Sequence, residues 1–434
     1  MRRTWILLPI SLLALACRDA APTEPQALIG LPLPVPLPGP VRIDLGTFGG
    51  ASSYANDINS DGTVVGSADN AAELRRAFRW TPLGGMTDLG TLPGDDWSMA
   101  ISITDDGQIL GQSGSSSVST SRGTYVLWSS DGTITALAIP LLPGALLGVA
   151  SDFNARGEVI GSDVFATQHA WIWSEAQGKY DITANVPGGS REGGASQIDA
   201  GGLVVGTSSA GTCSQYPFPN PSCWHAFLFS YEAGYRDIGT PGDDPNATVM
   251  GMGLNDGPTV VGSASIPGLG GRPYRWTEAE GFTILEAVSG YATSVNGGGL
   301  AVGTVWDAVL SAAQATAWPR SGGAIRLSPD DPNPSIATGV NNAGVVVGWT
   351  AQSGGGNHAT LWLLGPASEL LTALAARDAL KPALSVGTAT VAAKAAGAAA
   401  NACLSDTHAL LSRGALFDCV NRSAAPLARV RTGF

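Results

Sequence analysis

Between residues 41 and 365, short runs of alternating hydrophobic and polar residues are separated by turns rich in Gly and Asx. The stretch "ANDINSDGTVVGSA" at 55–68 shows the unit, and "RAFRW" and "MTDLGTL" follow it. β-Branched and aromatic runs between Gly and Asx turns are the signature of β-hairpins. The pattern therefore predicts a unit of four short antiparallel strands.

This unit is written seven times, with a spacing of 41 to 56 residues between successive copies. The Gly that ends each "VVG" run recurs at Gly66, Gly111, Gly161, Gly206, Gly262, Gly303 and Gly348. Seven residues upstream stand Asn59, Thr104, Asn154, Asp199, Asn255, Asn296 and Asn341. Four residues before those stand Ala55, Ala100, Ala150, Ala195, Gly251, Ala292 and Ala337. The third strand ends in Trp80, Trp128, Trp173, Phe229, Trp276, Trp318 and Trp362.

Four strands in about 45 residues is the period of a propeller blade. A single such sheet cannot bury both faces, whereas seven sheets arranged radially bury each face against a neighbour. The small residues then suit strands that converge on the axis. The fold class predicted is all-β, a seven-bladed β-propeller of four-stranded blades. A solenoid that stacks its units sideways is the alternative.

The fourth strands predict how the ring closes. "MTDLGTL" at 86–92 completes the first unit and "YRDIGTP" at 235–241 the fourth, but no such segment follows Trp362. An unmatched copy, "RIDLGTF", stands at 42–48, before the first unit. We therefore expect an N-terminal strand, Arg42 to Thr47, to pair with the strand that ends at Trp362, because an unfilled blade would expose a sheet edge.

The combined motif resembles the HAF-repeat family of exported bacterial proteins. "DLGTFGGASSYANDINSDGTVVGSA", "RAFRW" and "MTDLGTL" follow that family's pattern, and "HAFLF" at 225–229 is close to its typical end. The resemblance covers residues 42 to 362. The chain departs from the pattern at Pro258 in the fifth unit and at "YVLW" in the second. The resemblance implies export and a repeat scaffold, and it implies no enzyme activity.

The N-terminus predicts export. Two Arg, the apolar run "WILLPISLLALA" and small residues before Cys17 form a secretory signal at 1–16. "LLALAC" resembles a lipobox, in which Cys17 carries lipid and anchors the chain to a membrane. An ordinary signal peptide cut nearby is the alternative. Arg18 after the Cys favours, by that resemblance, an outer-membrane or cell-surface lipoprotein. Residues 17–40 are then a Pro-rich spacer.

After the propeller region at 41–365 the composition changes. Residues 366–434 are rich in Ala and predict a small helical appendage at the C-terminus. If Cys17 is lipidated, four Cys remain in an exported chain, and we expect disulfides between Cys213 and Cys223 and between Cys403 and Cys419. The net charge of −12 argues against nucleic acid as a partner.

No cluster of residues with metal-ligand spacing is evident. His169, His225 and His358 share a register with Arg76, Thr124, Arg272 and Gln314, which indicates a hydrogen-bonding position rather than a metal site. Asp57, Asn59 and Asp61 before Gly62 are spaced like the opening of a calcium loop, but the downstream acidic ligand is missing. We therefore expect no cofactor, with calcium at this turn as the alternative.

Variable loops on a rigid scaffold are better candidates for function than the repeat anchors. The loops between the fourth and next first strands, and between second and third strands, emerge on one face of a propeller. The candidate binding residues there are Asp95, Asp96, Trp97, Asp243, Asp244 and Trp306. The hypothesis is a surface-tethered binding or interaction module for a glycan or protein ligand. The alternatives are a glycan hydrolase or lyase with carboxylates at the channel mouth, and a scaffold of an envelope assembly.

Overall fold

The computed structural model describes residues 40–116, 123–164, 168–186, 192–212, 222–266, 268, 270–329 and 331–364. Two short 3-10 helices, η1 (Thr183–Asn185) and η2 (Pro241–Asp243), accompany the strands. The strands, in chain order, are β1 (Val41–Asp44), β2 (Gly49–Ile58), β3 (Val64–Asn70), β4 (Arg75–Thr81), β5 (Gly85–Asp88), β6 (Trp97–Ile103), β7 (Ile109–Gly114), β8 (Thr124–Trp128), β9 (Ile134–Ala136), β10 (Leu147–Phe153), β11 (Val159–Val164), β12 (Gln168–Ser174), β13 (Gly178–Asp181), β14 (Gly193–Ile198), β15 (Val204–Thr212), β16 (Ser222–Ser230), β17 (Gly234–Asp237), β18 (Thr248–Leu254), β19 (Thr259–Ile266), β20 (Gly270–Thr277), β21 (Gly281–Ile284), β22 (Gly290–Val295), β23 (Ala301–Asp307), β24 (Ala312–Trp318), β25 (Ile325–Arg326), β26 (Ser335–Val340), β27 (Val345–Ala351) and β28 (Asn357–Leu363).

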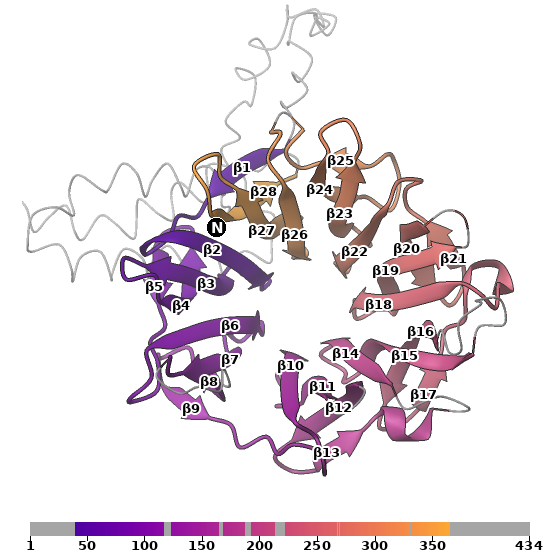
Figure 1. Ribbon diagram of the computed structural model, residues 1–434, viewed down its shortest axis with the longest axis horizontal. Helices are drawn as coiled ribbons and strands as arrows, with labels where there is room; N and C mark the ends of the chain where they lie inside the picture. Colours follow the sequence, from indigo (N-terminus) through magenta and orange to yellow (C-terminus); the bar gives the residue numbers. More distant parts are fainter. Residues whose placement is uncertain are drawn as a thin grey trace, which may run out of the picture. The chain divides into compact units, whose positions relative to one another are not determined.

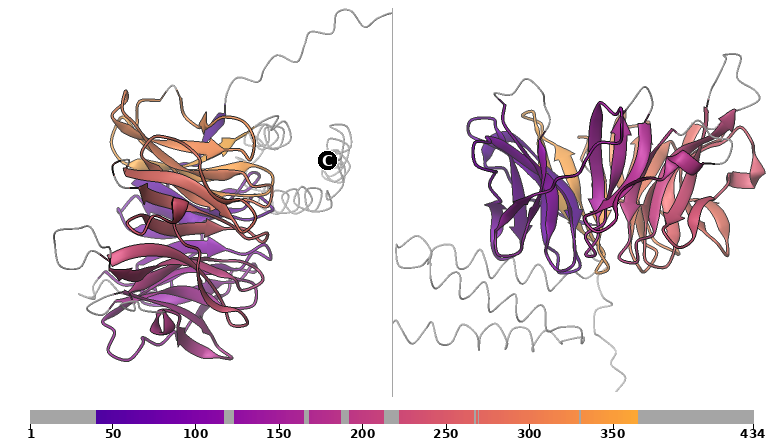
Figure 2. Two further views of the ribbon diagram at one scale, coloured as in Figure 1. Left: turned by 90° about the vertical axis from the view of Figure 1, so that its right-hand side faces the viewer. Right: turned by 90° about the horizontal axis from the view of Figure 1, so that it is seen from below.

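These strands form seven four-stranded antiparallel sheets, arranged radially as the blades of a propeller (Figure 1). Blade 1 pairs β2-β3-β4-β5, and blades 2 to 6 repeat this order with the next twenty strands. The first strand of each blade lies nearest the central axis, and the side views show the blades packed face to face (Figure 2). The predicted seven-bladed propeller is thus the fold of the chain.

The Gly that ends each "VVG" run allows the first two strands of a blade to approach closely. In every blade the first strand has a bulge directly after the small residue, as between Ala55 and Asp57. A Cβ on Gly66 would overlap the carbonyl oxygen of Tyr54, and the equivalent overlap recurs in the other six blades. This position therefore tolerates no side chain, which explains why the sequence repeats Gly there.

Hydrophobic side chains pack in seven clusters, one at each interface between neighbouring blades. Trp80, Trp128 and Trp362 are almost fully buried in these clusters. In blade 3 the predicted anchor Trp173 is only half-buried, and Trp171 fills the interface instead. Burial of these rings stabilises each interface by hydrophobic contact.

The outer strands are shorter than the sequence predicted. β5 and β17 each end at the Asp of the Asp-x-Gly sequence rather than running on to residues 92 and 241. The Oδ1 atom of Asp88 accepts a hydrogen bond of 2.8 Å from the amide of Gly90, whose φ of +82° turns the chain. Asp237 and Gly239 make the same turn. An Asx turn therefore terminates the strand at this position.

The fourth strand of blade 7 is β1, which pairs antiparallel with β28 in the register Val41 to Leu363 and Asp44 to Thr360. It begins one residue earlier than expected and ends at Asp44 rather than Thr47, because Asp44 and Gly46 form the same Asx turn. In addition, Thr338 Oγ1 of blade 7 donates a hydrogen bond to the carbonyl of Ala55 in blade 1. Blade 7 therefore lies beside blade 1 in a closed ring, which excludes the solenoid.

The shared register of the His residues is a hydrogen-bonding position, as expected. His169, His225 and His358 place Nδ1 at 2.7 to 3.0 Å from the Asp that ends the outer strand of the same blade. In blade 7 that Asp is Asp44 of β1, so His358 helps to hold the closing strand. In blade 1, Arg76 takes the place of His and contacts Asp88.

The signal, Cys17, the spacer and the C-terminal segment at 366–434 lie outside the described residues. Cys213, Cys403 and Cys419 lie outside them as well, so both disulfides stay predictions.

Candidate functional site

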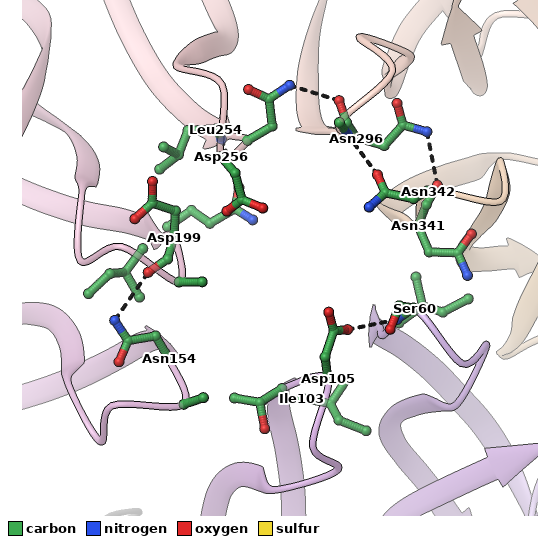
Figure 3. A pocket seen from close by; sticks show the side chains of 18 of the residues that line it. Ser60, Ile103, Asp105, Asn154, Asp199, Leu254, Asp256, Asn296, Asn341 and Asn342 are labelled. Carbon is green, nitrogen blue, oxygen red and sulfur yellow. Dashed lines mark hydrogen bonds between the residues drawn. The ribbon is translucent and has the colours of Figure 1, made fainter. Parts of the chain in front are cut away.

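A cavity of about 280 Å³ opens at one end of the central axis. The turns between the first and second strands of the blades surround it (Figure 3). These are the turns that carry the repeated "Asn-x-x-Gly" sequence. The cavity volume lies just below the usual range for small-molecule sites.

Seven apolar side chains, one from each blade, form a ring in the wall of this cavity. Each stands directly before the repeated Asn position: Ile58, Ile103, Phe153, Ile198, Leu254, Val295 and Val340. All are largely buried, since they also belong to the clusters between blades. The wall below the polar rim is therefore apolar and firmly packed.

The repeated Asn side chains hold the blades together at this end. Asn296 Nδ2 donates a hydrogen bond of 2.9 Å to the carbonyl of Asn341 in the next blade. Asn341 Nδ2 in turn donates one of 3.1 Å to the carbonyl of Asn59, across the closing interface. Asn59, Asn154 and Asn255 do the same, so five of the seven described interfaces carry this bond.

The five Asn side chains are buried, and each uses both its Nδ2 and its Oδ1 atom within the protein. The Oδ1 atom of each accepts a backbone amide four residues later, as Asn296 accepts that of Leu300 at 3.0 Å. The two exceptions to the ring are Thr104 and Asp199, which stand where the other blades have Asn. The Thr104 hydroxyl donates to Asp106 within its own turn, and the carboxylate of Asp199 accepts rather than donates, so the ring is interrupted at both positions.

The charged residues that line the cavity are all carboxylates: Asp105, Asp106, Asp199 and Asp256. Asp105 and Asp256 follow the Asn position in blades 2 and 5 and are exposed, and Asp199 is half-buried. Figure 3 shows Asp199 and Asp256 side by side, with Asp105 beside Ser60 across the opening. Asp105 Oδ1 accepts the amide of Ser60 at 2.9 Å and Asp199 Oδ1 that of Leu203 at 2.7 Å, leaving one oxygen on each.

Electrostatics at the mouth favour a positive charge. No Lys, Arg or His is found among the residues that line the cavity. Burial raises the pKa of Asp199 above its ordinary value, and the nearby carboxylate of Asp256 raises it further. A cationic group placed between these two carboxylates would relieve that repulsion.

Two side chains of the turn considered for calcium have hydrogen-bond partners within the protein. Asp57 accepts hydrogen bonds from the amides of Ile58 and Ile103, and Asn59 belongs to the Asn ring. Among the described residues there is no group of three His, Cys, Asp or Glu that could hold a metal ion.

The residues that the sequence singled out lie at the other end of the axis. Asp95, Asp96, Trp97, Asp243 and Asp244 precede or begin first strands, and Trp306 lies near the end of a second strand. Antiparallel strands place these segments opposite the turns that surround the cavity. None of the six lines the cavity.

Most of these six side chains have local structural contacts. Asp95 accepts a hydrogen bond from Ser113 Oγ at 2.6 Å, and Asp96 accepts one from the amide of Ser116 at 2.7 Å. Asp244 accepts the amide of Asn246 in an Asx turn. The indole of Trp97 covers Gly114, whereas Trp306 is 53% exposed.

The acidic positions of the cavity were missed because each stands next to a repeat anchor. The position after the Asn anchor is Ser60, Asp105, Ala155, Ala200, Asp256, Gly297 and Asn342 in the seven blades. It varies freely while its neighbours repeat. A comparison of the variable positions inside the repeated turns would have found Asp105 and Asp256.

Comparison with known proteins yields the fold and no family. No protein-family model and no curated protein matches the chain. The β-propeller domain of the trilobed protease from Pyrococcus furiosus, described as having an open velcro topology, is 11% identical over 72% of this chain and 95% of its own, with a TM-score of 0.47. A puromycin-hydrolysing peptidase from Mycobacterium tuberculosis is 10% identical over 74% of this chain and 52% of its own, with a TM-score of 0.50. The chain thus spans about half the length of that peptidase, and the likeness is one of fold alone.

Proposed function

We propose that the protein is a binding module whose ligand enters the cavity at the Asn-ring end of the axis. The observation that carries this proposal is a cavity with a ring of apolar side chains in its wall and the carboxylates of Asp105, Asp199 and Asp256 at its rim, each with one oxygen available. The ligand chemistry that fits is an aliphatic chain ending in an ammonium or guanidinium group. A Lys or Arg side chain on a protein or peptide partner has that chemistry.

The test is the affinity for a basic peptide. Asp256→Asn and Asp199→Asn are each expected to weaken the binding of a Lys-containing peptide about tenfold, because a charge-assisted hydrogen bond contributes about 1.5–3 kcal/mol. Binding is measured by calorimetry at two salt concentrations, and we expect it to weaken at the higher one. Asp131→Asn, which makes the same charge change in the exposed turn before β9, serves as the control.

Equal weakening in the Asp131→Asn control would show that net charge alone attracts the peptide. Binding that is unchanged in both mouth variants would place the site elsewhere.

A glycan-active hydrolase is the second candidate, and the pair Asp199 and Asp256 favours it. Most glycoside hydrolases use two neighbouring carboxyl groups, one of which has a raised pKa and acts as the general acid. Here the pKa of Asp199 is raised, and Asp256 lies beside it. Release of reducing ends from polysaccharides, lost in both Asp→Asn variants, would support hydrolysis. Binding of the basic peptide without any such release would support the binding module.

We also propose that the protein is an exported lipoprotein, tethered through Cys17 and spaced from the membrane by residues 18–40. "LLALAC" and the Pro-rich spacer support this. No helix in the described part of the chain is long and apolar enough to cross a membrane.

The lipid anchor is tested by one substitution. Cys17→Ser is expected to abolish acyl labelling and to move the protein from the membrane to the soluble fraction, because the thiol is the site of lipid attachment. Fractionation after labelling with a fatty-acid analogue measures both. A variant that stays with the membranes would contradict the lipoprotein assignment.

A further inference from the structure

Two carboxylates from different blades share one serine hydroxyl near the central axis. The Oγ atom of Ser102, in β6 of blade 2, lies 2.9 Å from Asp57 Oδ2 and 2.5 Å from Asp152 Oδ1. Asp57 belongs to β2 of blade 1 and Asp152 to β10 of blade 3. Ser102 and Asp152 are 6% and 9% exposed, whereas Asp57 is half-buried, so the Ser102–Asp152 side of the network is the better shielded from water.

Backbone amides complete the network and extend it across the blades. Asp57 Oδ2 also accepts the amide of Ile103 in blade 2, at 2.9 Å. Asp152 Oδ2 accepts the amide of Ile198 in blade 4, at 3.0 Å. The two carboxylates therefore link four consecutive blades by hydrogen bonds.

Counting protons shows that the network is one proton short when both carboxylates are ionised. A serine hydroxyl carries a single hydrogen and can donate it to only one of the two carboxylates. The oxygen of the other carboxylate would then lie at hydrogen-bonding distance from Ser102 Oγ with no hydrogen between the two atoms. A buried pair of negative charges with no shared proton is strongly unfavourable.

In the described part of the chain, no Lys, Arg or His acts on Asp57 or Asp152 to compensate the two charges. The titratable group that faces Asp57 from the turn after β6 is Asp105, another carboxylate. Gln197 on β14 and Gly339 on β26, which lie on either side, do not titrate.

We propose that the Asp57–Ser102–Asp152 network holds one proton at neutral pH and that its loss loosens the seam between blades 1, 2 and 3. In this arrangement Asp152 Oδ1–H donates to Ser102 Oγ, and Ser102 Oγ–H donates to Asp57 Oδ2. The network lies outside the residues that line the cavity, so this inference does not rest on the proposed ligand.

The pKa values of the two groups agree with this assignment. Burial raises the pKa of Asp152 to about 7, and the charge of Asp57 adds to the effect. Burial likewise raises the pKa of Asp57 to about 6. A carboxyl whose pKa is higher in the folded than in the unfolded chain stabilises the fold at low pH, and this stabilisation is lost as pH rises through the folded pKa. The loss is therefore expected between about pH 4 and pH 8.

The test is thermal unfolding of the full chain at several pH values. We expect the Tm of the unsubstituted protein to fall by about 5 °C between pH 5.5 and pH 8.5. In Asp152→Asn the amide is a permanent donor to Ser102, so most of this fall should disappear. Asp106→Asn, in the blade that carries Ser102, is the matched control, because hydrogen bonds from Thr104 and Gln108 lower the pKa of Asp106 and it stays ionised throughout.

Infrared spectroscopy tests the proton directly, even where a variant fails to fold. The unsubstituted protein should show the carbonyl band of a protonated carboxylic acid at pH 6, and the band should vanish by pH 8.5. Absence of the band at pH 6, or a fall in Tm that Asp152→Asn leaves intact, would overturn the proposal.

Discussion

Deletion of residues 41–48 is expected to lower the free energy of unfolding of the whole propeller by about 5 kcal/mol and to promote aggregation. The deletion removes the ladder between β1 and β28, the hydrogen bond from the amide of Leu45 to the carbonyl of Ala359, and the His358–Asp44 pair. Several hydrogen bonds at about 1 kcal/mol each, together with the burial of Ile43 and Leu45, account for this magnitude. The deletion would also leave the edge of β28 unpaired, and a strand of another molecule could then pair with it and start aggregation.

Thermal unfolding and size-exclusion chromatography measure the two effects. The matched control returns the deleted strand to the other end of the chain: residues 41–48 follow Leu363 through the turn Pro82–Gly84, which joins β4 to β5 in blade 1. This permuted chain should regain most of the lost stability. A deletion that leaves the melting temperature unchanged would contradict the role of β1 in closing the ring.

Substitution of Lys179 by Met is expected to destabilise the fold by about 3–5 kcal/mol, because it leaves Asp163 charged and unpaired in the interior. The side chains of Lys179 and Asp163 are 4% and 0% exposed, and Lys179 Nζ lies 2.7 and 2.8 Å from the two carboxylate oxygens. The same Nζ donates to the carbonyl of Pro140 at 2.8 Å and lies 3.9 Å from the centre of the Trp171 ring. Through Pro140, this pair therefore holds the segment that joins blades 2 and 3.

Denaturation in urea measures the effect, and a double variant isolates its cause. Lys179→Met combined with Asp163→Asn removes both charges and should recover more than half of the loss, since a buried pair replaced as a whole is far less costly than a broken one. Arg236→Met breaks the exposed pair with Glu278 and should cost less than about 1 kcal/mol. A single variant as mild as Arg236→Met would show that water reaches Asp163.

Much of the fold could be predicted because its determinants are local and are repeated. The Gly of each "VVG" run and the Asx turn at Asp88 are each required by contacts within one blade. The sequence therefore states the Gly requirement seven times and the Asp-x-Gly turn three times. The closing strand could be predicted for the same reason. The segment "RIDLGTF" repeats the fourth-strand motif but stands before the first unit, so it has no preceding strands to pair with. Only its end was misplaced, because the hydrogen bond from Gly46 to Asp44 stops the strand early.

The candidate site could not be predicted in the same way. Asp105, Asp199 and Asp256 stand in different blades, at positions that the repeat leaves variable or fills with Asn, and nothing in the sequence connects them. In the loops that the sequence predicts as binding sites, the carboxylates of Asp95 and Asp244 accept hydrogen bonds from nearby residues of the same blade or turn. Whether a polar side chain can still bind a ligand depends on the hydrogen bonds that it makes to its neighbours in space. These neighbours cannot be read from the sequence.

The sequence by itself determined the number of blades, the four strands of each, the terminal strand that closes the ring and the positions that must be Gly, Asn or Asp. These follow from short-range hydrogen bonds and close backbone contacts, which the chain encodes within about 45 residues. Only the tertiary structure decided that carboxylates from three blades share one cavity, and that Ser102 lies between Asp57 and Asp152. These contacts arise when the ring closes and brings together residues from separate blades, so their chemistry depends on distances that no local pattern specifies.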